Sequence, residues 1–162
     1  FKQIFSPQTA YQMTSILEGA IQRGTGKLLR DLNLQIAGKT GTTNNNTDTW
    51  FIGFTSNLVV GVFVGYDSPK KLGKYETGSK TALPIFKDFI KKAVNNYEAR
   101  PFKISKGIKM MVIDAETGEK ADFGSKKTII ESYKKEKFEN QTFISNDKYK
   151  SDIYKKNILK FY

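Results

Sequence analysis

The stretch DTWFIGFTSNLVVGVFVGYD, residues 48–67, contains two apolar runs that are separated by Ser56-Asn57. A polar pair between two β-favouring runs predicts a hairpin, with strands over residues 48–55 and 58–66. The second run is apolar almost throughout, which predicts a strand that is covered on both faces. The hairpin is therefore expected to contribute two strands to a larger sheet.

Further elements are predicted on both sides of this hairpin. A third strand is expected over residues 35–43, and a helix over residues 7–22, where Ser6 can act as the N-cap and Pro7 suits the first turn. A second helix is expected over residues 82–97, with one apolar stripe formed by Ile85, Phe86, Phe89, Ile90, Ala93, Val94 and Tyr97. The fold class is α+β, with three antiparallel strands packed against two helices.

The chain is expected to change character after Arg100-Pro101. The stretch IKMMVIDAETGEKA, residues 108–121, predicts a small hairpin that turns at residues 116–118. From about Lys126 the chain is rich in lysine and poor in apolar residues, which predicts partial disorder. We therefore expect a main domain portion, a small β extension and a lysine-rich tail, over residues 1–97, 98–125 and 126–162.

The composition excludes several kinds of site. The 162 residues include neither cysteine nor histidine, so the chain cannot supply a disulfide, a thiolate, a Ser-His-Asp triad or an imidazole metal ligand. Any general base in the chain has to be Lys, Asp, Glu or Tyr. The net charge of +11 is spread along the chain, whereas a nucleic-acid domain more often clusters it on one element. Two interpretations of this charge are open. It could attract the chain to an anionic surface, either lipid or cell wall, or it could result from a compositional bias alone.

The beginning of the chain carries no targeting signal. The first residue is Phe1, and no basic-then-apolar run follows it. The longest apolar stretch, LVVGVFVGY, is too short to span a bilayer as a helix. The chain is expected to be soluble and to start at an interior point of a longer protein.

The stretch AGKTGTTNNN, residues 37–46, resembles the end of a phosphate-binding loop. That motif requires a glycine five residues before Gly38, where this chain has Asn33, and it must lead into a helix. Here a turn and a strand are predicted instead. A nucleotide site is therefore not expected.

Lys-Thr-Gly on a strand suits a different ligand. Alternation places Lys39 and Gly41 on one face and Thr40 and Thr42 on the other, although a twisted edge could bring Lys39, Thr40 and Thr42 toward one cleft. Gly41 allows a ligand to approach the backbone, and an exposed edge can pair with an extended peptide. One amide could stabilise an oxyanion, an effect worth about 3–4 kcal/mol in acyl transfer. An ordinary strand with surface lysine and threonines remains the alternative.

Lys39-Thr40-Gly41 resembles the Lys-Thr-Gly element of penicillin-binding proteins and serine β-lactamases. The stretches SPQTAYQMTSILEG and ETGSKTALPIFKDFI strengthen the likeness, which runs from about Ser6 to about Tyr97 and more weakly through IDAETGEKA. Together they resemble the distal half of the transpeptidase domain of a class A penicillin-binding protein. The resemblance implies a partial β-lactamase/transpeptidase-like fold, truncated at its N-terminal side, with no cofactor and no metal.

The resemblance also implies an activity and site roles. The activity is peptidoglycan cross-linking by D,D-transpeptidation through a serine acyl-enzyme, which β-lactams also form. Lys39 would be the catalytic ammonium, and Thr40, Gly41 and Thr42 would bind substrate, with the threonine hydroxyls holding its terminal carboxylate. The Thr42 amide would form half of the oxyanion hole. Partners would be stem peptides, β-lactams and the upstream part of the same protein, without nucleic acid.

The chain departs from the family pattern in its nucleophile. The family needs Ser-x-x-Lys and Ser-x-Asn before Lys-Thr-Gly, and neither occurs there. Ser-x-x-Lys occurs only later, at residues 68–71, 132–135 and 145–148, where chance matches are expected, and Ser79 replaces a glycine that is common in relatives. Without the rest of the domain, four aromatic side chains are expected to be under-buried: Trp50, Phe51, Phe54 and Phe63.

Two hypotheses about function remain open. The chain is either the C-terminal segment of a bifunctional glycosyltransferase–transpeptidase or a non-catalytic remnant of a truncated or split gene. In the first case the isolated chain would be inactive, and the protein would lie at the periplasmic face of the inner membrane, anchored only through its upstream region.

Overall fold

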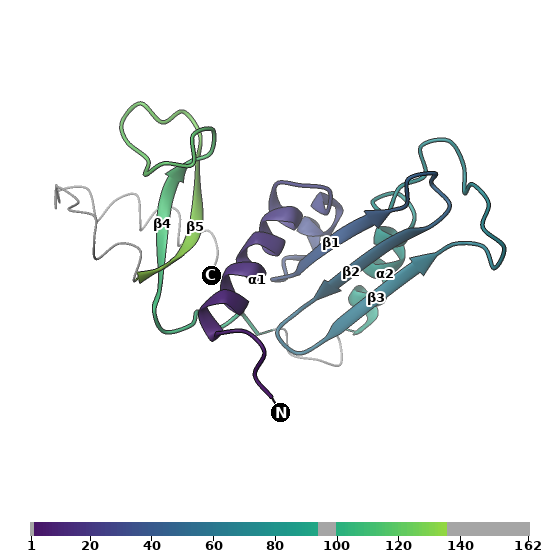
Figure 1. Cartoon of the computed structure of the whole chain (residues 1–162), viewed down its shortest axis with the longest axis horizontal. Helices are drawn as coiled ribbons and strands as arrows, with labels where there is room; N and C mark the ends of the chain where they lie inside the picture. Colours follow the sequence, from purple (N-terminus) through teal and green to yellow (C-terminus); the bar gives the residue numbers. More distant parts are fainter. Residues whose placement is uncertain (1, 94–99, 136–162) are drawn as a thin grey trace.

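The computed structural model describes residues 2–93 and 100–135 (Figure 1). The elements follow one another in this order: α1 (Pro7–Gln22), the 3-10 helix η1 (Lys27–Leu32), β1 (Ala37–Thr42), β2 (Thr49–Phe54), β3 (Val59–Val64), α2 (Ala82–Ala93), β4 (Ile108–Asp114) and β5 (Thr128–Lys134). The two predicted helices and the three predicted strands of the main sheet are confirmed over these bounds, whereas η1 and β5 were not predicted. Residues 94–97 of the expected second helix lie outside the described residues.

Helix α1 begins where the sequence predicts. The side chain of Ser6 accepts a hydrogen bond of 3.2 Å from the Thr9 amide, and Pro7 occupies the first helical turn. The helix lies between the other parts of the molecule, because it contacts β1 on one side and β5 on the other (Figure 1).

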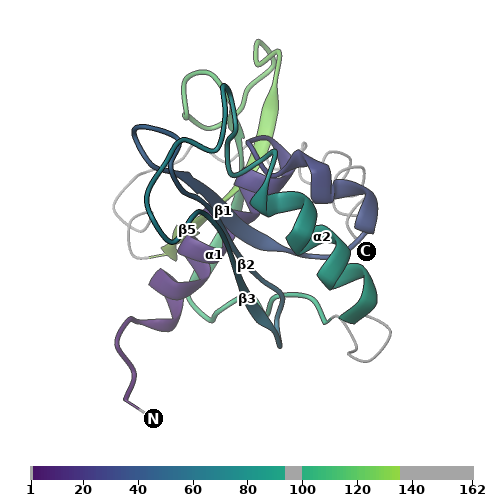
Figure 2. The ribbon, with the colours of Figure 1, turned by 90° about the vertical axis from the view of Figure 1, so that its right-hand side faces the viewer.

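The first three strands form one antiparallel sheet in the order β1-β2-β3. Helix α2 covers one face of this sheet (Figures 1 and 2). Phe51 and Phe86 are fully buried at the interface, with ring centroids 4.6 Å apart in an edge-to-face arrangement. The expectation that Phe51 is under-buried is wrong, because α2 is sufficient to cover this face. The buried hydrophobic core consists of Ile21, Leu29, Ile36, Phe51, Ala82, Leu83, Phe86 and Ile90.

The opposite face of the sheet carries exposed apolar side chains. Trp50 is 42% exposed and Phe63, its cross-strand neighbour, is 50% exposed, as expected. Ile52 is 52% exposed and Val59 is 72% exposed. We refer to Trp50, Ile52, Val59 and Phe63 as the bare face. The prediction that the strand over residues 58–66 is covered on both faces is wrong for the described chain, because α2 covers only one.

Phe54 is only half-buried, as expected, and meets the ring of Phe102 at a centroid distance of 5.6 Å. The apolar stripe of α2 is narrower than predicted, since Phe86 and Ile90 are buried whereas Ile85 and Phe89 remain about half exposed. Val94 and Tyr97 of that stripe lie outside the described residues.

Strands β4 and β5 form a separate antiparallel hairpin. The expected turn at residues 116–118 is present, since the Asp114 carboxylate accepts hydrogen bonds from the Glu116 and Thr117 amides and Gly118 has a φ of +75°. The main partner of β4 is nevertheless β5, which lies beyond the last strand that the sequence predicts. Strand β5 was not predicted because its isoleucines, Ile129 and Ile130, are adjacent and do not alternate with polar residues. Lysines also lie close to them on both sides in the sequence. The division into three parts stays a prediction.

Polar contacts hold this hairpin against α1. The Gln12 side chain donates to the Ser132 carbonyl at 3.0 Å, and the Arg23 guanidinium pairs with the Glu131 carboxylate at 2.7 Å. The Lys134 ammonium donates to the Thr9 hydroxyl at 2.9 Å. The hairpin and the three-stranded sheet are thus both attached to the same helix.

Candidate functional site

The Lys-Thr-Gly stretch lies on β1, the edge strand of the three-stranded sheet. The strand is uneven in its exposure. Ala37 and Gly38 are buried, whereas Lys39 and Thr42 are exposed and the residues between them are half-buried. The C-terminal part of the edge strand is therefore the part that a ligand can reach.

The hydrogen-bond pattern of the sheet sets the direction of the Thr42 amide. The Thr43 amide donates to the Asp48 carbonyl at 3.0 Å, toward the neighbouring strand. Backbone groups of successive residues point to opposite edges of an antiparallel strand. The N–H of Thr42 is therefore directed away from β2, toward the edge that carries no further strand among the described residues.

The ammonium of Lys39 bends over this edge. Its Nζ atom lies 2.9 Å from the Thr40 carbonyl oxygen and 3.5 Å from the Thr40 hydroxyl oxygen. The two side chains leave the strand on opposite faces, so the contact requires the lysine to cross the edge. Lys39 and Thr40 thus approach each other, and Thr42 lies two residues further along the face of Thr40. That all three residues face one cleft stays a prediction.

Gly41 lies on the same face as Lys39, over the bare side of the sheet. A Cβ atom at this position would stand 3.3 Å from the Cβ of Trp50, its cross-strand partner. Space therefore exists only for a side chain that displaces its neighbour slightly. This close approach favours glycine at position 41 over a residue that carries a Cβ atom.

Two residues outside the motif contact its threonines, and the sequence did not single them out. The Thr25 hydroxyl lies 2.9 Å from the Thr40 hydroxyl, and the Gly78 amide donates to the Thr42 hydroxyl at 3.1 Å. The only sequence signal is glycine itself, since Thr25 lies between two glycines in QRGTG and Gly78 is the glycine of ETGSK. Contacts across 15 and 36 residues leave no periodicity from which they could be predicted.

The nucleotide alternative fails in the structure. After Lys39, Thr40 and Gly41 the chain makes a turn and enters β2, and no helix follows. A phosphate loop depends on the amides of a helix N-terminus directly after the lysine. The turn and strand predicted after the motif are confirmed.

Two of the three Ser-x-x-Lys matches begin within the described residues, and neither begins on a helix. Ser68 lies in an exposed loop, and Ser132 lies on β5, where it is only 7% exposed. The match at residues 145–148 lies outside the described residues. Within residues 2–93 and 100–135, no cluster of three carboxylate, imidazole or thiol groups could hold a metal.

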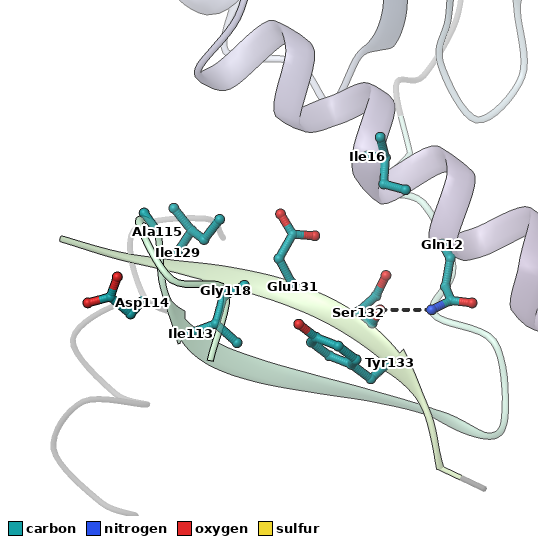
Figure 3. Close-up of a pocket in the computed structure, with 10 residues that line it drawn as sticks. All are labelled: Gln12, Ile16, Ile113, Asp114, Ala115, Gly118, Ile129, Glu131, Ser132 and Tyr133. Atoms are coloured by element: carbon teal, nitrogen blue, oxygen red, sulfur yellow. Dashed lines mark hydrogen bonds between the residues drawn. The ribbon is translucent and has the colours of Figure 1, made fainter. Parts of the chain in front are cut away.

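A pocket of about 350 Å³ lies between α1 and the β4–β5 hairpin (Figure 3). Its walls come from the middle of α1 and from both strands, and Glu131 projects into it toward the helix (Figure 3). None of the residues of the Lys-Thr-Gly stretch lines it. The pocket therefore belongs to the packing of the hairpin against α1 and is distinct from the motif.

A comparison with known protein families identifies the domain to which β1 belongs. Residues 1–91 match the family model "Penicillin binding protein transpeptidase domain". The chain belongs to this family. Its fold is a partial transpeptidase fold of the α+β class, as the sequence predicts.

Transpeptidase-domain relatives extend the match along most of the chain. Penicillin-binding protein 1A of Rickettsia conorii is 48% identical over 139 residues, which are 84% of this chain and 17% of that protein. The Rickettsia typhi protein of the same name is 52% identical over 76% of this chain and 15% of its own length. The crystal structure of penicillin-binding protein 1A from Haemophilus influenzae superposes with a TM-score of 0.68 at 30% identity, over 78% of this chain and 20% of that one. The chain thus spans about a sixth of the length of the curated relatives it matches.

Proposed function

We propose that this chain is the distal half of a transpeptidase domain and takes part in peptidoglycan cross-linking as a segment of a longer penicillin-binding protein. The observation that carries the proposal is the exposed end of β1. There a cation, two hydroxyls and an outward-directed amide occupy four consecutive residues, Lys39 to Thr42. An edge strand of this kind can pair with an extended peptide and hold its terminal carboxylate.

Each group has a distinct role in the proposed reaction. The Lys39 ammonium lies beside the serine nucleophile of the complete domain. The Thr40 and Thr42 hydroxyls hold the terminal carboxylate of the stem peptide, and Gly41 lets the peptide backbone approach. The Thr42 amide donates one of two hydrogen bonds to the oxyanion, a contribution of about 3–4 kcal/mol to the transition state.

The nucleophile comes from outside these 162 residues in this proposal. A serine attacks the penultimate D-alanine carbonyl, and the peptide bond to the terminal D-alanine breaks, so that this D-alanine leaves as a free amine. An amine of a neighbouring strand then attacks the serine ester, takes over the acyl group and releases the serine hydroxyl. β-Lactams acylate the same serine. Because this serine is absent from the 162 residues, the isolated chain is inactive in cross-linking. The upstream region also supplies glycosyltransferase activity.

The cellular location follows from the same proposal. No helix within the described ranges combines the length and apolar character needed to cross a bilayer. We place the protein at the periplasmic face of the inner membrane, held there through its upstream region. The chain itself contacts stem peptides and not nucleic acid.

Labelling with a fluorescent penicillin tests this function. The 162-residue chain is compared with a protein that adds the upstream region, and both are examined by denaturing electrophoresis. Covalent label is expected only on the extended protein. Stoichiometric labelling of a serine in the 162-residue chain would show that the nucleophile has been wrongly assigned.

The coding sequence upstream of Phe1 separates the two hypotheses about the gene. An in-frame continuation that encodes Ser-x-x-Lys supports the bifunctional enzyme. A stop codon in that frame supports a non-catalytic remnant instead.

A further inference from the structure

We infer that Thr25 and Gly78 are positioning residues that orient the two hydroxyl groups of the Lys-Thr-Gly stretch as donors toward an anion. The inference deepens the proposed function and rests on it for the identity of the anion, a peptide carboxylate. It adds two residues that lie outside the motif, one on each side of β1 in the sequence.

The environment of the Thr40 hydroxyl favours one direction for its proton. A hydroxyl has one hydrogen to donate and two lone pairs that accept. The Lys39 ammonium approaches the Thr40 oxygen at 3.5 Å and can only donate to it. The Thr25 hydroxyl lies 2.9 Å from the Thr40 oxygen, and by distance alone either hydroxyl of this pair can donate. In the inferred arrangement Thr25 is the donor, so both lone pairs of the Thr40 oxygen are used and the Thr40 proton remains for a ligand.

The Thr42 hydroxyl is oriented in the same way from the other side. The Gly78 amide can only donate, so at 3.1 Å it uses a lone pair of the Thr42 oxygen. The Thr42 proton is then directed elsewhere. Two O–H donors and one ammonium are a suitable set for a carboxylate, which only accepts hydrogen bonds.

Both positioning groups are held by close packing of glycines. Gly78 is buried, and a Cβ atom there would lie 2.5 Å from the Trp50 carbonyl oxygen and 2.7 Å from that of Gly41. The Gly78 carbonyl in turn accepts from the Leu83 amide at 2.8 Å, which ties the loop to the start of α2. A residue with a Cβ atom would push the loop away from the sheet, so only glycine allows the amide of residue 78 to reach the Thr42 hydroxyl.

Thr25 is fixed by its own neighbours after the end of α1. Gly26 is buried, donates its amide to the Ala20 carbonyl at 3.0 Å, and has no room for a Cβ atom, which would lie 2.5 Å from the Ile21 side chain. The backbone around Thr25 is therefore folded back on the last turn of the helix. This arrangement presents the Thr25 hydroxyl to Thr40 without help from a ligand.

The first test measures side-chain rotamers in the full 162-residue chain by NMR. Three-bond couplings report whether χ1 of Thr40 occupies one rotamer or several. We expect one rotamer in the unmodified chain and in Thr25→Ser, and averaging in the isosteric Thr25→Val. The matched control is Thr14→Val, whose hydroxyl bonds only within α1, to the Ala10 carbonyl at 3.0 Å. An unchanged single Thr40 rotamer in Thr25→Val overturns the inference.

The second test measures recognition of a carboxylate. The chain is titrated with N-acetyl-D-alanyl-D-alanine and with the same peptide carrying a C-terminal amide, while the Thr42 amide resonance is followed. We expect Thr25→Val to weaken binding of the acid about threefold to tenfold, as for the loss of one hydrogen bond, and Thr25→Ser to restore it. The affinity for the amidated peptide should not change. Equal affinity of Thr25→Val and the unmodified chain for the acid counts against the inference.

The two tests separate the inference from the function on which it rests. Gly78→Ala should disturb the Thr42 rotamer, and Thr25→Val remains informative if the alanine variant does not fold. Should the unmodified chain bind neither peptide, the proposed ligand is contradicted, while the Thr40 rotamers still decide whether Thr25 positions the motif.

Discussion

The two faces of the three-stranded sheet differ in what covers them. On one face Phe51 and Thr49 are fully buried, and Phe86 of α2 packs edge-to-face on Phe51. On the other face Trp50 and Phe63 stack on each other, with centroids 4.8 Å apart, and remain 42% and 50% exposed. Strands β2 and β3 thus have one face buried in a core and one face of apolar side chains that stay partly exposed.

The contrast shows which contacts this chain supplies itself. The covered face is built from residues of β2, β3 and α2, all within the region that matches the transpeptidase model. The bare face groups four apolar residues that a soluble surface seldom gathers in one place. We interpret it as the side on which the remainder of a longer domain packs, and variants on the two faces can be compared directly.

The largest expected effect is on the covered face, from Phe51→Ala. Truncating a fully buried phenylalanine removes apolar contacts and leaves a cavity, which costs about 3–5 kcal/mol. Urea denaturation of the chain should show this loss of unfolding free energy. Phe63→Ala is the matched control on the bare face and should cost about 1 kcal/mol or less, because half of that side chain is already in water. Equal costs would remove the distinction between the faces.

Two glycines on β2 and β3 give a second matched pair. A Cβ atom at Gly53 would lie 2.6 Å from the Phe51 ring and 2.7 Å from the Phe86 ring, so Gly53→Ala should cost about 1–3 kcal/mol through overpacking. At Gly61, on the bare face, the nearest atom is 4.0 Å away. Gly61→Ala should be neutral or slightly stabilising, since alanine restricts the unfolded chain. Thermal melts of both variants distinguish these outcomes.

Glu18 on α1 gives a pH-dependent prediction. Burial raises the pKa of the Glu18 carboxyl from 4.5 to about 7, so the folded chain binds this proton more tightly than the unfolded chain. The free energy of unfolding should therefore fall as pH rises from about 4.5 to about 7. Allowing for partial exposure, the loss is about 1–2 kcal/mol.

The control for this dependence is Glu18→Gln, which has a similar shape and cannot ionise. It should remove the fall between these pH values and raise stability above pH 7. A chain with Glu18→Gln that keeps the same pH profile would assign the titration to another group.

The smallest effect is expected at the Asp31–Lys87 ion pair, where the charged atoms are 2.7 Å apart. The hydrogen bond from Lys87 lowers the pKa of the Asp31 carboxyl below 3.8. Its contribution is therefore present at neutral pH and is lost as pH falls through the lowered folded-state pKa. Asp31→Asn should lower the Tm only slightly at pH 7, because the Asp31 side chain is 64% exposed, and the difference from the unmodified chain should shrink in acid. A large destabilisation at pH 7 would contradict this ranking.

Much of the fold was predictable because its signals are local. The Ser6 cap, the Ser56-Asn57 turn and the apolar runs of β2 and β3 each depend on residues close in sequence. Strand β5 was not predicted, because its apolar residues lie among lysines and its stability comes from pairing with β4 and packing on α1. Tertiary contacts of this kind leave no local pattern.

The candidate site also contains residues that could be predicted from the sequence and residues that could not. Lys39 to Thr42 could be identified from a short motif on a predicted strand. Thr25 and Gly78 could not, because their roles depend on the path of two loops that meet β1 from distant positions. The bare face was foreseen only from the likeness to a longer domain. The burial of Phe51 was missed because the chain itself supplies a core on that side, from Phe86 of α2 together with residues such as Leu29 and Ile36.

The fluorescence of Trp50 tests the interpretation of the bare face most directly. Trp50 is the only tryptophan in the 162-residue sequence, so its emission reports this face without labelling. We predict emission typical of a solvent-exposed indole for the chain alone, and a shift to shorter wavelength when the upstream half of a transpeptidase domain, free of tryptophan, is added as a separate polypeptide. Phe63→Asp should weaken this association. An emission maximum that stays unchanged while the two polypeptides form a complex would contradict the account, because the upstream half would then pack elsewhere.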